Sequence, residues 1–68
     1  MNYQKMIKMA MANKGIRTQH ELAHRAGISK GNLSDIANGN TEPKVKTLVK
    51  IADACGVGIA TFLSYGDE

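Results

Sequence analysis

Apolar side chains recur along this chain three and four residues apart, which is the spacing of one face of an α-helix. The first series predicts an amphipathic helix over residues 3–14, with Asn2 as its N-cap and Gly15 at its C-terminal end. The apolar positions of this helix are Tyr3, Ile7, Ala10 and Met11. Polar residues are interspersed with them, so we expect one face to be buried and the other to contact water.

Two short helices joined by a tight turn are predicted within residues 18–40. Thr18 can cap the first of them, and Glu21 three residues later fits a capping box. Gly27 can adopt a left-handed conformation and end that helix, and Ser29 can cap the next one. The apolar residues that can close on each other across the turn are Leu22, Ala26, Ile28, Leu33 and Ile36. This arrangement is typical of a helix-turn-helix unit.

The C-terminal half predicts two more helices. The first has its apolar face at Val45, Leu48, Ile51, Ala52 and Cys55 and ends at Gly56; the second has apolar positions at Ile59, Phe62 and Leu63. Residues 64–68 are expected to form a short tail. The chain therefore predicts an all-α fold, a compact five-helix domain over residues 1–68 in which the second and third helices form the helix-turn-helix.

The second helix of the turn unit, around Lys30–Asn38, has two different faces. Its apolar residues, Leu33, Ile36 and Ala37, point to one side of an idealised wheel, and Gly31, Ser34, Asp35 and Asn38 point to the other. The outer face is polar and short-chained, as a surface inserted into a DNA groove should be. We therefore expect this helix to read DNA.

The residue types at these offsets resemble the phage repressor/Cro type (XRE-like) of helix-turn-helix family. The residues that carry the resemblance are Gln19, Leu22, Ala23, Gly27, Ser29, Leu33, Ile36, Asn38, Gly39 and Pro43. The run TLVKIADACGV is similar to the family's next helix and its exit. The resemblance implies a sequence-specific regulator of transcription, of bacterial or phage origin, that binds double-stranded DNA at a near-palindromic operator as a homodimer.

Specific contacts follow from the same resemblance. Base contacts are implied for Lys30, Gly31, Asn32 and Asp35; phosphate contacts for Gln19, Ser29, Asn38, Asn40, Thr41 and Lys44; and a dimer surface for Val57, Ile59 and Ala60. Many family members carry Arg or Lys in the loop after the reading helix, where this chain has the acidic Glu42. For Asp35 an alternative stays open, in which its side chain caps a local backbone group and misses the bases.

The composition agrees with an anionic partner. The net charge is +3, and six of the nine Lys and Arg residues lie within residues 1–30. The single cysteine cannot form an internal disulfide, which suits the reducing cytoplasm. We expect no signal peptide and no membrane span, because the N-terminal stretch has no uninterrupted apolar run.

Other functions have weaker support in the sequence. His20 and His24 could share a metal, but no third ligand is apparent near them, so two solvated histidines are the simpler interpretation. Cys55 lies on an apolar helix face and is expected to be a small buried hydrophobe rather than a nucleophile. We expect no enzyme activity, no cofactor and no small-molecule ligand. The alternative function is that of an antitoxin, a protein-interaction module that also binds its own promoter.

Overall fold

The computed structural model describes residues 1–67, and its first helix, α1, spans Tyr3–Lys14. Asn2 caps this helix, because its Oδ1 atom accepts a hydrogen bond of 3.0 Å from the backbone N–H of Lys5. Gly15 ends it with a φ of 76°, a left-handed conformation that glycine adopts without a steric penalty. The predicted helix limits and both caps are confirmed.

The second helix, α2, spans Gln19–Ala26 and is likewise delimited by local signals. The hydroxyl of Thr18 accepts a hydrogen bond of 3.1 Å from the backbone N–H of Glu21. The Glu21 carboxylate pairs with Arg25 one turn later, at 2.9 Å. Gly27 ends α2 with a φ of 72°. Residues close in the sequence therefore mark both ends of this helix.

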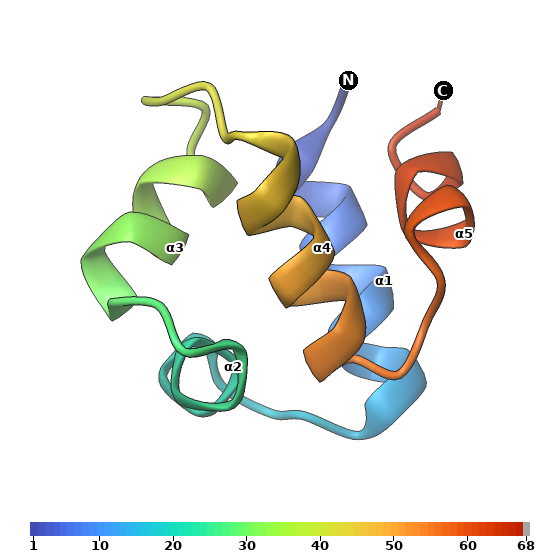
Figure 1. Ribbon diagram of the computed structural model, residues 1–68, viewed down its shortest axis with the longest axis horizontal. Coiled ribbons are helices and arrows are strands. Elements are labelled where there is room, and N and C mark those ends of the chain that lie inside the picture. The colour runs from blue at the N-terminus through green and yellow to red at the C-terminus, as the bar shows by residue number, and fades with distance from the viewer. Residues whose placement is uncertain (68) are drawn as a thin grey trace.

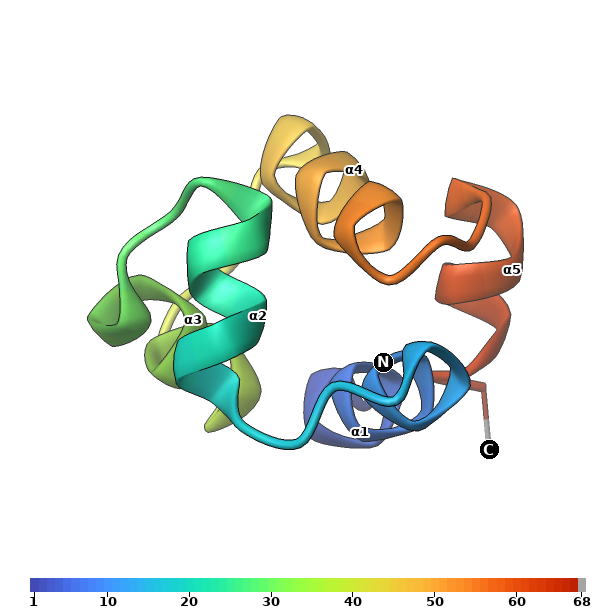
Figure 2. The same cartoon turned by 90° about the horizontal axis from the view of Figure 1, so that it is seen from below.

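Three helices complete the fold: α3 over Lys30–Ala37, α4 over Val45–Ala54 and α5 over Ile59–Ser64. Helix α2 packs on α3 and α4, while α5 packs on α1 and α4. A further contact joins α1 and α3, so the five helices surround one core (Figures 1 and 2). The all-α, five-helix prediction is confirmed.

The core consists of apolar side chains from every helix. Its members below 2 % exposure with the largest volumes are Phe62, Met6, Ile7, Leu22, Leu33, Ile36, Ile51 and Cys55. Burying each such side chain contributes roughly 1.5–3 kcal/mol, which holds short helices that would be unstable alone. Cys55 is a buried member of this core, and burial raises the pKa of its thiol, which disfavours the nucleophilic thiolate.

The C-terminal residues differ from the tail that was expected over residues 64–68. Ser64 completes α5, and Gly66 is buried. The Gly66 carbonyl accepts a hydrogen bond of 3.3 Å from the N–H of Asn2, and the Asp67 carbonyl accepts one of 3.3 Å from Nζ of Lys5. These residues pack on the start of α1, because α5 runs back toward it (Figure 1). Glu68 lies outside the described residues.

None of the helices within residues 1–67 has the length and apolar composition that crossing a bilayer requires.

Candidate nucleic-acid interface

Helix α3 is held in the fold by its apolar side. Leu33, Ile36 and Ala37 are 0 %, 1 % and 6 % exposed, and the helix packs on both α1 and α2. At its N-terminal end, the Ser29 hydroxyl accepts a hydrogen bond of 3.0 Å from the N–H of Asn32. This N-cap and this buried stripe set the direction of the helix and leave its other side facing solvent.

The solvent side of α3 carries the four residues predicted to contact bases. We call this set the α3 outer face: Lys30, Gly31, Asn32 and Asp35, all of them exposed. A β-carbon added at Gly31 would meet no atom within 4 Å, so the surface there is open. The Asp35 carboxylate makes no hydrogen bond or ion pair with any residue in 1–67, which argues against the local backbone cap.

The end of α3 engages the backbone amide of Asn40, a residue predicted to contact phosphate. Gly39, at a φ of 75°, donates its N–H to the carbonyl of Ile36 at 3.1 Å, and Asn40 donates its N–H to the carbonyl of Asp35 at 2.9 Å. This is the Schellman pattern that follows a glycine after a helix. The Asn40 amide is therefore occupied, and only the exposed side chain of Asn40 stays available. The next amide, of Thr41, donates to no acceptor among residues 1–67.

A depression of about 300 Å³ lies between α3 and the start of α4. We call it the loop depression, and its lining residues are Asn32, Ile36, Thr41, Glu42, Pro43, Lys44 and Thr47. It brings Asn32, a predicted base contact, together with Thr41 and Lys44, two predicted phosphate contacts. Thr47 was not predicted, although its place in the first turn of α4, three residues after Lys44, was a usable signal.

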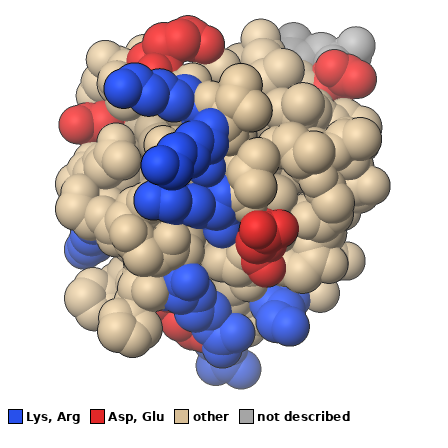
Figure 3. Space-filling model, viewed as in Figure 1, with Lys and Arg blue, Asp and Glu red and all other residues tan. Residues whose placement is uncertain are grey.

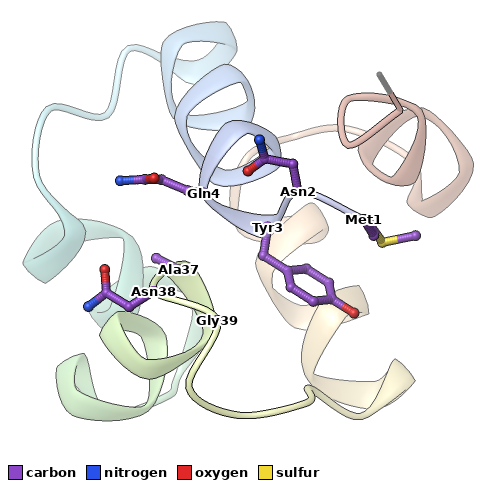
Figure 4. A pocket seen from close by; sticks show the side chains of 7 residues that line it. All are labelled: Met1, Asn2, Tyr3, Gln4, Ala37, Asn38 and Gly39. Carbon is purple, nitrogen blue, oxygen red and sulfur yellow. The ribbon is translucent and has the colours of Figure 1, made fainter.

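The four other predicted phosphate contacts lie outside this depression: Gln19, Ser29, Asn38 and Asn40. Gln19 is the first residue of α2 and is half-buried. Asn38 donates from its Nδ2 atom to the Ser34 hydroxyl at 3.4 Å and lines a second depression of about 520 Å³. That depression lies between the start of α1 and the end of α3, and Figure 4 shows its lining side chains. The candidate phosphate contacts are thus distributed around α3 rather than gathered at one point.

Basic side chains gather on the face of the molecule that Figure 3 shows. Figure 3 shows Lys and Arg in a column over the region of α4, with acidic residues mostly around it. Lys44, Lys46 and Lys50 are exposed, and the last two are four residues apart on α4 and share a side of the helix. Such a surface attracts the phosphates of a nucleic acid.

The structure also locates the residues of the predicted dimer surface and the two histidines considered as metal ligands. Val57 and Ile59 are half-buried and pack against the core, whereas Ala60 is exposed. His20 and His24 are both exposed on α2. Within residues 1–67, no three His, Cys, Asp or Glu side chains gather as a metal site requires.

Comparison with known proteins places this geometry in a family. The helix-turn-helix family HTH_3 matches residues 7–62, which include α2, the turn and α3. The chain is also 43% identical over 47 residues to the type II methyltransferase M.Sau96I of Staphylococcus aureus. That alignment covers 69% of this chain but only 11% of the methyltransferase. Because the family match spans most of the chain, including the capped helix α3 and its buried stripe, the chain belongs to the HTH_3 family of Cro/C1-type helix-turn-helix DNA-binding domains.

Proposed function

We propose that this chain recognises an operator sequence in double-stranded DNA and regulates transcription by occupying it. The observation that supports this function best is the junction of the α3 outer face with the loop depression, where Asn32 lies beside Thr41 and Lys44. One surface thus offers groups for base edges and groups for phosphates. The mechanism is equilibrium binding, with no covalent step.

The α3 outer face provides distinct chemistry for base recognition. Lys30 can donate hydrogen bonds to O6 and N7 of guanine, and Asn32 can form a bidentate pair with adenine. Gly31 has no side chain and allows the backbone to approach the groove closely. Asp35 accepts hydrogen bonds only, so it tolerates cytosine N4 or adenine N6 and disfavours a bare acceptor.

Phosphate contacts would fix the register of α3 in the groove. We assign them to Gln19, Ser29, Asn38, the side chain of Asn40, Thr41 and Lys44. Because the Asn40 amide is engaged with Asp35, the amide of Thr41 takes its place in this proposal. Polar groups on both sides of α3 would then contact the phosphates of the two DNA strands that border the major groove.

A homodimer would complete the recognition. One reading helix contacts too few base pairs for a unique genomic site, so two copies should bind half-sites about 34 Å apart. The residues that we assign to the dimer surface are Val57, Ile59 and Ala60. Val57 and Ile59 are half-buried and pack against the core, so they form a fixed apolar edge that a second copy could contact, which supports this role.

A second candidate function comes from the similarity to a methyltransferase. The 43% identity with M.Sau96I suggests a domain that brings such an enzyme to DNA or controls its synthesis. In that case α3 would still read DNA, and the chemistry would belong to another part of the protein. Both candidates share the same interface, but they differ in the target site.

Selection of binding sites from a random pool of duplex DNA tests the proposal. We expect a near-palindromic site to be enriched, and Lys30→Ala to lose affinity for it. Lys8→Ala is the matched control, because Lys8 is exposed on α1 and its replacement removes the same charge. Failure to enrich any sequence would contradict operator recognition. Enrichment of a methyltransferase target sequence or promoter would favour the second candidate.

A further inference from the structure

A single hydrogen bond joins the start of α1 to the loop between α3 and α4. The hydroxyl of Tyr3 donates to Oε1 of Glu42 at 2.7 Å, across 39 residues of sequence. The length is typical of a strong hydrogen bond to an ionised carboxylate. The Tyr3 ring packs against the core, so its hydroxyl is held in place. Figure 4 shows this ring extending from the first turn of α1, away from the Asn38 side chain.

Glu42 is an unfavourable residue for a DNA-binding surface. It lines the loop depression beside Asn32 and Lys44, and it is the only acidic residue in the loop over 38–44. A carboxylate at that place repels phosphates directly. It can also pair with Lys44 and cancel the positive charge that phosphate needs.

In the structure, the Glu42 carboxylate is not paired with Lys44, and it is not without a hydrogen-bond partner. Lys44 forms no ion pair with any residue in 1–67, although Glu42 is only two residues away. The Glu42 carboxylate is instead directed to Tyr3. Glu42 is thus hydrogen-bonded to a residue of α1 and not paired with Lys44.

We infer that Tyr3 is a positioning residue for DNA binding, because its hydroxyl holds Glu42 on the α1 side of the loop and leaves Lys44 available to phosphate. This inference rests on the proposed function. It also explains how this loop could bind phosphate although it carries Glu42, in a loop where many family members carry Arg or Lys. The Tyr3 hydroxyl takes no part in reading bases.

A double-mutant cycle tests the inference. The probe is a labelled random-sequence duplex, titrated with the whole chain at several salt concentrations. We expect Tyr3→Phe to weaken binding about two- to five-fold at low salt, the size of one exposed charge interaction, and the loss to shrink as salt rises. Glu42→Gln should bind at least as tightly as wild type. In the Glu42→Gln background, Tyr3→Phe should have no further effect.

Tyr65→Phe is the matched control, because Tyr65 is also half-buried and makes no side-chain hydrogen bond with residues 1–67. Thermal melts of every variant check that folding is retained. Equal losses from Tyr3→Phe in both backgrounds, or no loss in either, would overturn the inference while DNA binding stands. Absence of binding by wild type at the lowest salt would overturn the proposed function, and the inference with it.

Discussion

Met6 and Gly66 lie so close together that position 66 has no room for a β-carbon. A β-carbon built on Gly66 would fall 2.6 Å from Sδ of Met6 and 2.7 Å from its Cγ. Met6 is fully buried and cannot easily move away. The glycine is thus required by packing between the two ends of the chain, since its backbone is not in a left-handed conformation.

We predict that Gly66→Ala destabilises the fold by about 1–3 kcal/mol, the usual cost of overpacking a filled core. Urea unfolding measures the change. Gly31→Ala is the matched control, because a β-carbon there meets nothing and α3 gains a better helix former, worth about 0.5–1 kcal/mol of added stability. We expect Gly66→Ala to lower the free energy of unfolding and Gly31→Ala to raise it. Equal effects would show that Met6 does not crowd Gly66.

The cap of α3 offers a way to separate stability from DNA affinity. Ser29→Ala should cost about 1 kcal/mol of stability, because the N–H of Asn32 loses its acceptor. Ser29→Asp retains a good cap and should keep the melting temperature, but it places a negative charge where we assign a phosphate contact. Its DNA affinity should fall. Asn2→Asp makes the same change in charge at the cap of α1 and should affect DNA binding much less.

Specificity should depend on Asp35. We expect Asp35→Ala to raise non-specific affinity and to flatten the base preference at one operator position, where a mismatch normally costs about 1–3 kcal/mol. Binding to all four base pairs at each position, at fixed salt, measures this. Asp53→Ala removes the same charge from an exposed position on α4 and should leave base preferences intact. Unchanged preferences in Asp35→Ala would show that Asp35 does not read DNA.

Dimerisation should be sensitive to Ala60. Because Ala60 is exposed, Ala60→Glu should leave the melting temperature nearly unchanged. On an operator with two half-sites we expect a loss of roughly tenfold or more, because the avidity of the pair disappears. Binding to one half-site should not change. Ala12→Glu, also exposed but on α1, is the control. A loss on the single half-site would place Ala60 in the DNA contact instead.

The contact between Tyr3 and Glu42 also predicts a dependence of stability on alkaline pH. Its hydrogen bond to Glu42, together with burial, raises the pKa of the Tyr3 hydroxyl above the ordinary value of 10.0. The stabilisation by this hydrogen bond is therefore fully present below the pKa that the Tyr3 hydroxyl has in the unfolded chain. It is lost as the pH rises through the pKa of the same hydroxyl in the folded chain. The difference in melting temperature between wild type and Tyr3→Phe should be constant from neutral pH to about pH 9 and shrink above that. A constant difference up to the highest pH would contradict the contact.

Much of the α3 region was predictable because its signals are local. Ser29 as a cap, the buried stripe and the glycine after the helix act within a few residues of each other, and the structure confirms all three. The engagement of the Asn40 amide was local too, since Gly39 at the C-terminal end of a helix commonly brings the next N–H back to the helix. That consequence of a correctly identified glycine was missed.

The sequence by itself determined the helix limits, most of the apolar core positions and the exposed residues of α3, because capping and periodicity depend on neighbours within about two turns. Two core assignments were wrong. Val45, expected on the apolar face of α4, is its first residue and is 71 % exposed, whereas Met6, absent from the predicted apolar face of α1, is fully buried. Tertiary structure alone decided the partners of Tyr3 and Gly66. The hydrogen bond from Tyr3 to Glu42 and the contact of Met6 with Gly66 each join distant parts of the chain. Their formation depends on how helices cross and on where α5 returns to α1, and no local spacing encodes that geometry.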